Sequence, residues 1–272
     1  AFNPFIPNDE DNSSIPAAFF EIEIKNITDE TIEYQTALSV ANPFKITRNR
    51  SEIADGIRVL KLYSGADKDD ADYGELCVAS DCEDVHIQTC WYRGKWRDGV
   101  VTYWSEFDSC ENLNDRSYDE DGDSDTGTVS ATVKIMPGEI ERVRFVLSWN
   151  IPNNRKYWGK DDEQKLGWKN YYAAMFANSS ESAVYAIKNW DELYRRTALF
   201  KNELYGSSLS KPVIDAIASN LSVLKSPTVL RLEDGSFYGW EGVHENEGSC
   251  EGTCQHVWNY AYALCFLFPR LE

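Results

Sequence analysis

The residues best suited to chemistry lie in a glycine-rich stretch near the end of the chain. Its acids and the tryptophans that bracket them are, in order, Trp240, Glu241, Glu245, Glu247, Glu251 and Trp258, and two of the chain's three histidines share the stretch. Carboxyl groups beside aromatic rings are what a site needs if it holds a sugar and cleaves its glycosidic linkage. Glycines give such a loop the backbone freedom to close off a pocket. The stretch therefore predicts a carbohydrate site.

Helices are predicted on both sides of this acidic loop, and they are the elements that position it. Apolar residues recur after the loop at three- and four-residue steps, on one face of a helix. These residues are Val257, Tyr260, Ala261, Leu264 and Phe268. Before the loop, similar spacing predicts a helix over residues 182–205 that stops at Gly206, and another over residues 212–224 with Pro212 in its first turn.

The first 150 residues show the alternation of β-strands. After an extended lead-in over residues 1–16, strands are predicted over residues 19–27, 31–40, 57–64, 75–80, 85–92, 128–136 and 140–150. A short polar turn joins the first two runs, which predicts that they pair as an antiparallel hairpin. So many strands without an intervening helix indicate a β-sandwich. We expect a sandwich domain over residues 1–177 and a helical domain over residues 178–272.

Two segments resemble one family of enzymes. The run DGSFYGWEG followed by HVWNYAYALCFLFP, and the opening run NPFIPNDEDNSSIPAAFFEIEIKN, are similar to glycoside hydrolase family 116. This is the family of the bile-acid β-glucosidase, or non-lysosomal glucosylceramidase. The resemblance implies an antiparallel β-sandwich followed by the beginning of an (α/α)6 toroid. It also implies a retaining β-glycosidase that hydrolyses β-glucosides or glucosylated lipids without a cofactor.

The resemblance also implies which carboxylates act. Glu241 occupies the family's x-E-G position and would be the nucleophile that forms the glycosyl-enzyme. Glu251, in CEG, is the rival nucleophile, although capping of the following helix would also explain a carboxylate there. The family's acid–base aspartate lies further downstream, and a toroid needs more helices than the three predicted. The resemblance therefore implies a piece of a longer enzyme.

Four residues around the loop are candidates for binding the sugar. His244 and His256 each offer one donor and one acceptor when neutral, and would hydrogen-bond hydroxyl groups or orient a carboxylate. Trp240 and Trp258 would form the apolar platform under the sugar ring. The structural alternative for the histidines is that their polar groups are satisfied by hydrogen bonds at the edge of a loop. The alternative for the tryptophans, above all for Trp258, is packing in the core.

Two patterns resemble metal sites, but we predict no metal. His244, Cys250, Cys254 and His256 form an H-x5-C-x3-C-x-H cluster that offers zinc four ligands, yet its spacing is not that of a usual finger or ribbon. A disulfide between the two cysteines is the alternative under oxidising conditions. The acidic run over residues 119–127 imitates a calcium loop, but it lacks the glycine at position six and the acid at position twelve. A solvated hairpin loop is the favoured interpretation of that run.

Composition excludes several classes of partner. The formal charge of −18 argues against nucleic acids and anionic membrane surfaces, and it leaves neutral sugars unaffected. No apolar run approaches the ~20 residues of a transmembrane helix. Seven cysteines, an odd number, indicate mostly free thiols in a reducing compartment, and hence a cytoplasmic protein. Two rival functions stay open, a non-catalytic carbohydrate-binding sandwich and a metal-stabilised scaffold, and the oligomeric state is not predicted.

Overall fold

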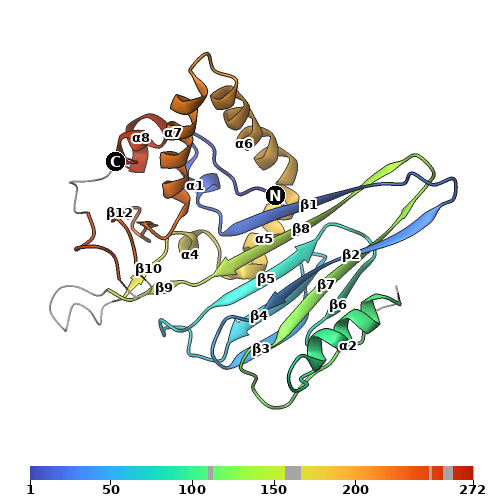
Figure 1. Cartoon of the computed structure of the whole chain (residues 1–272). Coiled ribbons are helices and arrows are strands. Elements are labelled where there is room, and N and C mark those ends of the chain that lie inside the picture. Colours follow the sequence, from blue (N-terminus) through green and yellow to red (C-terminus); the bar gives the residue numbers. More distant parts are fainter. Residues whose placement is uncertain (110–112, 157–166, 245–246, 254–259, 272) are drawn as a thin grey trace. The chain divides into compact units, whose positions relative to one another are not determined.

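The computed structural model describes all residues of the chain except 110–112, 157–166, 245–246, 254–259 and 272 (Figure 1). The chain forms two compact units, each built from several segments. Unit 1 consists of Ala1–Asn3, Pro16–Ile151 and Phe176–Asn189, and unit 2 of Pro4–Ile15, Pro152–Met175 and Trp190–Glu272. Both units therefore combine residues from the start of the chain with residues beyond position 150.

Unit 1 contains two antiparallel sheets that pack together. The five-stranded sheet has the order β1-β8-β5-β4-β3, with β1 Ala17–Lys25, β8 Ile140–Asn150, β5 Glu75–Ser80, β4 Ile57–Ser64 and β3 Thr47–Ala54. The three-stranded sheet has the order β2-β7-β6, with β2 Ile32–Ala41, β7 Thr126–Ile135 and β6 Val85–Gln88. The antiparallel, sheet-on-sheet arrangement predicted from the alternating runs is confirmed.

The core of unit 1 lies between the two sheets. Successive side chains of a strand point to opposite faces, so every second residue is turned toward the other sheet. The buried cluster consists of Leu60, Leu62, Val78, Val143 and Phe145 from the larger sheet and Ile87, Val129 and Ala131 from the smaller one. Burying one such large aliphatic or aromatic side chain contributes about 1.5–3 kcal/mol. This cluster is therefore a main source of stability in unit 1.

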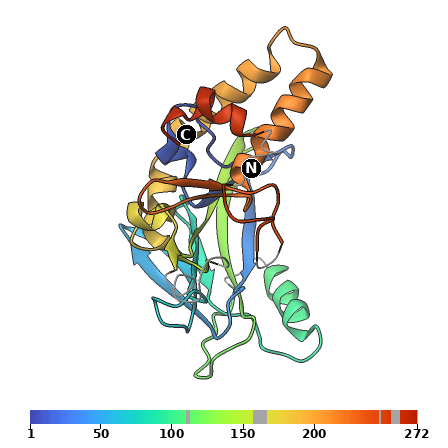
Figure 2. The same ribbon diagram turned by 90° about the vertical axis from the view of Figure 1, so that its left-hand side faces the viewer.

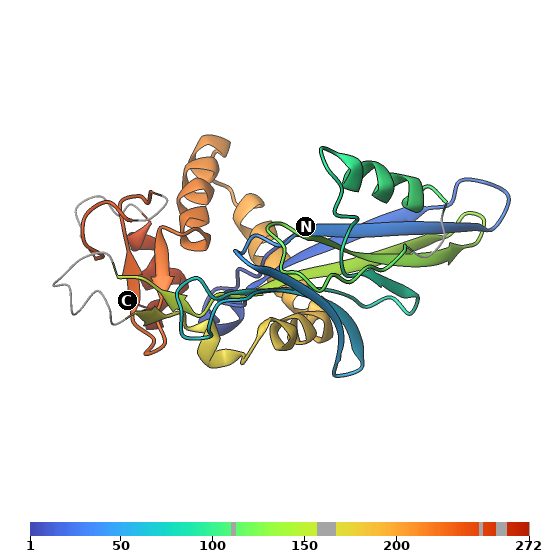
Figure 3. The ribbon, with the colours of Figure 1, turned by 90° about the horizontal axis from the view of Figure 1, so that it is seen from below.

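Helices lie on the outer faces of the two sheets (Figure 3). Helix α5 Ser179–Lys188 packs on the five-stranded sheet, and helix α2 Asp98–Phe107 lies against the three-stranded one. Tyr103 of α2 stacks on Trp91 with ring centroids 4.3 Å apart, and Gln88 of β6 donates to Glu106 of α2 at 3.0 Å. The prediction that no helix interrupts the strands is wrong, because α2 lies between β6 and β7 in the sequence.

The prediction that the first two strands pair as a hairpin is also wrong. Strand β1 pairs with β8 and β2 pairs with β7, so consecutive strands belong to different sheets. Asn26, which is fully buried, holds the connections together. Its side-chain Nδ2 donates to the backbone oxygens of Glu30 (2.8 Å) and Ile135 (2.9 Å). Its backbone N–H donates to the backbone oxygen of Glu139 (3.0 Å). An alternating pattern identifies a strand, but its partner strand depends on how the apolar face is buried in the folded core.

A buried ion pair fastens α5 to the five-stranded sheet. Lys61 Nζ lies 2.8 Å from Glu75 Oε2, and the two side chains are only 6% and 8% exposed. The N–H of Ser179 donates to the same oxygen at 3.2 Å, so the carboxylate also lies at the amino end of α5, where negative charge is favoured. Burial acts to raise the pKa of Glu75, but hydrogen bonds from Lys61 and Tyr73 outweigh it and hold that pKa below its usual value.

Unit 2 contains the remaining helices and two small antiparallel sheets, β9–β10 and β11–β12. Its elements are α1 Glu10–Ser13, β9 Asn153–Asn154, β10 Trp168–Lys169, α4 Tyr172–Met175, α6 Trp190–Tyr205, α7 Lys211–Ser222, β11 Val229–Arg231, β12 Phe237–Gly239 and α8 Ala261–Leu267. Figure 2 shows α6 and α7 joined by a loop at the top of the view. As predicted, α6 ends before Gly206 and Pro212 lies in the first turn of α7.

The single helix predicted over residues 182–205 is instead two helices. Helix α5 ends at Lys188, Asn189 leaves the helical conformation, and α6 begins at Trp190. The side chain of Asn189 donates to the backbone oxygen of Tyr185 at 2.9 Å, where it competes with the helical hydrogen bonds. The break coincides with the boundary between the two units.

The opening residues are more than an extended lead-in, because they bind the helices of unit 2. Phe5 stacks on Phe200 of α6 at a centroid distance of 5.5 Å and meets Phe268 edge-on at 5.3 Å. The N–H of Asn8 donates to the backbone oxygen of Leu267 in α8 at 2.7 Å. The segment Pro4–Ile15 therefore ties α6 to α8, two helices that are distant in the sequence.

Two general features bear on the sequence predictions. None of the helices in the described residues has the length and apolar character needed to cross a membrane.

Four of the cysteines that the structure describes, Cys77, Cys82, Cys90 and Cys265, are free thiols. Burial raises the pKa of Cys77 to about 12, so this thiol stays protonated at neutral pH.

Candidate functional site

The loop that carries Glu241 begins at the end of a tight hairpin in unit 2. Strands β11 and β12 pair antiparallel, and the turn between them contains Asp234, Gly235 and Ser236. Asp234 Oδ1 accepts the N–H of Ser236 at 2.9 Å, and Gly235 has a φ of 87°, which favours glycine. Hydrogen bonds from Ser236 hold the pKa of Asp234 below its usual value. The DGS run therefore sets the register of the strand that leads to Glu241.

Trp240 fixes the backbone immediately before Glu241. It is 3% exposed, its N–H donates to the backbone oxygen of Thr228 at 3.0 Å, and its own backbone oxygen accepts the hydroxyl of Tyr260 at 2.7 Å. Gly248 lies so close to the indole that a Cβ there would be 2.2 Å from the ring. The indole is therefore an interior anchor in this structure, and its contact with a sugar remains a prediction.

Backbone hydrogen bonds join the two arms of the loop. The N–H of Ser249 donates to the oxygen of Gly242 at 2.8 Å, and the N–H of Thr253 donates to the oxygen of Gly239 at 2.9 Å. Gly252, on the second arm, packs on Tyr238, where a Cβ would lie 2.7 Å from the ring. The loop therefore folds back on itself and closes over the aromatic residues of β12.

Both candidate nucleophiles lie on this loop, one on each arm. The side chains of Glu241 and Glu251 are exposed, so a substrate could reach either carboxylate. The side chain of His244 is exposed, and the backbone N–H of His244 donates to the backbone oxygen of Glu247 at 2.6 Å. The structure therefore brings three of the predicted site residues into one loop.

The other predicted residues lie outside the part of the chain that the structure describes. These are His256 and Trp258, together with Cys254 of the zinc alternative. Among the described residues, no group of three or more His, Cys, Asp or Glu side chains could hold a metal ion. The following helix is described from Ala261 onward, and the burial of Leu264 confirms its apolar face there.

Two aromatic residues beside the loop were not singled out from the sequence. The rings of Trp168 in β10 and Tyr238 in β12 lie 4.8 Å apart, and Tyr238 lies 6.5 Å from Trp240. Unlike Trp240, both are only half-buried. They form a partly exposed aromatic surface at the base of the loop. The position of Tyr238 in the FYGW run could have indicated its place beside the loop. Trp168 reaches the loop through the pairing of β10 with β9, which the sequence does not show.

The acidic run over residues 119–127 belongs to unit 1 and is partly fastened by arginines. Asp125 is buried, accepts hydrogen bonds from Arg93 Nε and Nη2 at 2.8 Å each, and accepts the Thr47 hydroxyl at 2.7 Å. Arg48 pairs with the exposed Asp121 at 3.0 Å. The prediction of a solvated loop holds for Asp121 and is wrong for Asp125, because a bidentate arginine compensates its burial.

We expect the Arg93–Asp125 pair to make unit 1 sensitive to acid. Burial acts to raise the pKa of Asp125, but hydrogen bonds from Arg93 and Thr47 outweigh it and lower that pKa below the usual value. A carboxyl whose folded-state pKa is lowered stabilises the fold above its unfolded pKa of about 3.9, and this stability is lost as pH falls through the folded pKa. Thermal melting between pH 7 and pH 2 measures the effect.

The matched comparison is Asp125→Asn against Asp121→Asn. The first variant should be less stable at neutral pH and should lose less stability on acidification than the native protein. The second, which removes an exposed partner of Arg48, should keep the native pH profile. Equal profiles for all three proteins would show that the pair does not contribute to acid sensitivity.

The structure therefore combines two packed antiparallel sheets with several helices and a loop of acids and aromatic residues. The sequence model of one family, described as beta-glucosidase 2, glycosyl-hydrolase family 116 N-term, matches residues 1–193 of the 272. The chain belongs to glycosyl-hydrolase family 116, whose members are β-glucosidases, and carries the family's amino-terminal domain. No curated protein matches the chain. The loop with Glu241 lies beyond the matched residues.

Proposed function

We propose that this chain is part of a retaining β-glycosidase that hydrolyses β-glucosides or glucosylated lipids, and that Glu241 is its nucleophile. The observation that carries the proposal is the loop: Glu241 follows directly on a backbone that Trp240 anchors, in a chain of family 116. A rigid backbone keeps a nucleophile near its attacking geometry and lowers the entropic cost of reaction. Glu251, on the other arm, is the alternative nucleophile.

The remaining roles follow from the chemistry of retaining glycosidases. The nucleophile attacks the anomeric carbon while a second carboxyl group, about 5–5.5 Å away, protonates the leaving oxygen and later activates water. By resemblance to the family, an aspartate outside these 272 residues would be this acid–base group. His244 and His256 would hydrogen-bond the sugar hydroxyls, and Trp258, with the half-buried Tyr238, would contact the apolar face of the ring.

We also propose that unit 2 is the beginning of an (α/α)6 toroid. Its helices have large apolar side chains that are exposed, namely Tyr194, Leu199 and Tyr205 on α6, Val213 and Ile217 on α7, and Tyr262 and Phe266 on α8. Apolar surface of this extent on helices is typical of faces that other helices cover. Further helices of a toroid would supply that cover. The protein would act in a reducing compartment such as the cytoplasm.

The stereochemistry of hydrolysis tests the proposed function. The protein encoded by the complete reading frame that includes these residues should convert an aryl β-glucoside first into β-glucose, since two displacements retain the anomeric configuration. Proton NMR of the anomeric signals during the first minutes measures this. Release of α-glucose would contradict a covalent intermediate. Binding without any hydrolysis would favour the rival function, a non-catalytic carbohydrate-binding sandwich.

A further inference from the structure

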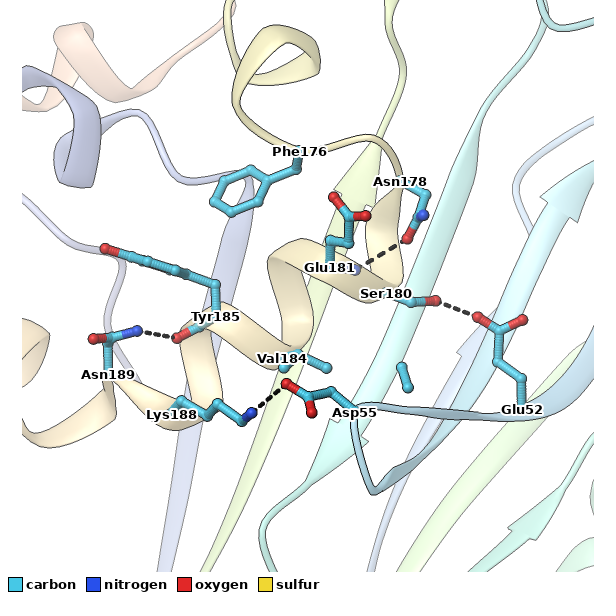
Figure 4. Close-up of a pocket in the computed structure, with 11 residues that line it drawn as sticks. Glu52, Asp55, Phe176, Asn178, Ser180, Glu181, Val184, Tyr185, Lys188 and Asn189 are labelled. Carbon is cyan, nitrogen blue, oxygen red and sulfur yellow. Dashed lines mark hydrogen bonds and ion pairs between the residues drawn. The ribbon is translucent and has the colours of Figure 1, made fainter.

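A cavity of about 510 Å³ lies beside α5, entirely within unit 1 (Figure 4). The end of β3 and the turn after it form one wall, and α5 with the residues that flank it forms the other. We call it the α5 pocket and define it by Asp55, Phe176, Glu181, Tyr185 and Asn189. Its volume falls in the range of about 300–1,000 Å³ that is typical of small-molecule sites. All the residues that line it belong to unit 1, whereas the predicted catalytic loop belongs to unit 2.

One side of the α5 pocket is aromatic. The rings of Phe176 and Tyr185 lie 5.5 Å apart at an angle of 58°, and Figure 4 shows them on the same side of the cavity. Phe176 is buried and Tyr185 is half-buried, so the tyrosine ring keeps surface that a ligand can contact. Val184 adds a buried aliphatic surface to the same lining. A ligand with an apolar face would pack against this side.

The other groups of the α5 pocket both accept and donate hydrogen bonds. Glu181 Oε2 accepts the N–H of Ala177 at 2.8 Å, and within the described residues its Oε1 has no hydrogen-bond partner. Asn189 donates its Nδ2 to the oxygen of Tyr185, and its amide oxygen likewise has no partner among the described residues. Asn178 accepts the N–H of Glu181 at 3.0 Å, which leaves its two amide hydrogens as donors for a ligand.

The charges of the α5 pocket disfavour anionic ligands. Asp55, Glu52 and Glu181 line it together with one cation, Lys188, and Glu52 is paired with Arg50 at 2.9 Å, so the net negative charge of the lining is small. Lys188 pairs with Asp55, but the two side chains are 49% and 69% exposed, so this ion pair is weak and can exchange for contacts with a ligand. Phosphate and carboxylate ligands are therefore disfavoured. A neutral polyhydroxylated ligand fits best, because each hydroxyl group both donates and accepts a hydrogen bond.

We propose that the α5 pocket binds a neutral sugar, with one face of the pyranose ring against Tyr185 and its hydroxyl groups on Glu181, Asn178, Asn189 and Asp55. This is a second carbohydrate site, separate in sequence and in unit from the loop of Glu241. It would hold a glycan chain or a second substrate molecule on the β-sandwich unit, without a part in bond cleavage.

The test is a titration with methyl β-D-glucopyranoside, followed by the backbone amide NMR signals of the protein. We expect millimolar affinity, with shifts concentrated in Ser179–Asn189 and at Asp55. Tyr185→Ala should weaken binding about tenfold, the factor that corresponds to about 1.4 kcal/mol. The matched control is Tyr194→Ala, which removes an exposed tyrosine of α6 in unit 2 and should bind like the native protein.

A second variant guards against misfolding. Asp55 has a φ of 49°, which asparagine tolerates, so Asp55→Asn should fold and should also weaken binding. Absence of shifts around α5, or native affinity in both folded variants, would overturn the proposal. So would stronger binding of arginine amide than of the glucoside, since the pocket would then be a cation site. Glu241→Gln should leave this binding unchanged, so the α5 pocket and the catalytic proposal can fail independently.

Discussion

Glu241→Gln is expected to lower kcat for an aryl β-glucoside by a factor on the order of 10⁴–10⁶, as removal of a covalent nucleophile does in other enzymes. Glutamine keeps the shape of the side chain, but its amide cannot form the glycosyl ester that divides the reaction into two steps. The loop should keep its fold, because Trp240, Tyr260 and backbone groups anchor it and glutamine has the size and shape of glutamate. Steady-state kinetics of the protein from the complete reading frame measures the loss.

One neighbouring glutamate of the loop serves as a matched control, and a second tests the rival assignment. Glu247→Gln changes an exposed acid of the same loop and should lower kcat less than about tenfold. Glu251→Gln distinguishes the rival assignments. If this variant loses activity on the scale expected for Glu241→Gln while the latter stays active, Glu251 is the nucleophile and the assignment from the x-E-G position is wrong.

The second large effect concerns stability. Lys61→Met should lower the free energy of unfolding of unit 1 by about 3–5 kcal/mol, because it leaves the carboxylate of Glu75 buried without its cation. Met fills most of the volume of the lysine side chain, so cavity formation adds little. The loss should be visible as a lower midpoint in urea with an unchanged slope.

A second lysine on a strand of unit 1 provides the control. Lys134 of β7 pairs with Glu33 of β2 at 3.6 Å, and the two side chains are 76% and 57% exposed. Lys134→Met should therefore cost less than about 1 kcal/mol. Adding Glu75→Gln to Lys61→Met should recover part of the stability, since the unpaired charge is removed. Equal losses for Lys61→Met and Lys134→Met would contradict a special role for the buried pair.

Much of the sheet structure could be predicted from alternation alone, but the pairing could not. Strand β3 is not among the predicted strands, although Asp55-Gly56 directly follows it and such a pair is the strongest local signal of a two-residue hairpin loop. Both residues have positive φ, 49° and 83°, as that turn requires. The strand lacks an apolar alternation because its sequence, TRNRSEIA, is mostly polar, as suits an edge of the sheet. The local sequence pattern is therefore sufficient to predict the hairpin of β3 and β4.

The pairing of β1 with β8 and of β2 with β7 cannot be predicted in this way, because it joins strands that are distant in the sequence. A polar turn between two alternating runs is compatible with a hairpin and with a crossing between sheets. In the structure the buried Asn26 holds the crossing in place, through bonds to residues more than 100 positions away along the chain. No short-range signal reveals such a contact, so the pairing of these strands cannot be predicted from local sequence patterns.

For the candidate site, the sequence indicated the loop but not the way it is held. Residue types alone placed Glu241, Glu251 and His244 in one acidic loop, and the structure brings them together there. The anchoring of Trp240 by Tyr260, and the packing of Gly248 on its indole, come from tertiary contacts. A tryptophan beside an acid has the same sequence signature whether it binds a sugar or fills a core.

The most direct test of the account is to find which residue becomes glycosylated. The protein from the complete reading frame would be treated with a covalent β-glucoside inactivator, digested, and its peptides fragmented in a mass spectrometer. The account predicts one glycosyl group per protein, in ester linkage to Glu241. A label on Glu251 would contradict the assignment of Glu241 as the nucleophile. A label outside residues 235–251, or inactivation without any label on them, would contradict the assignment of this loop as the nucleophile's position.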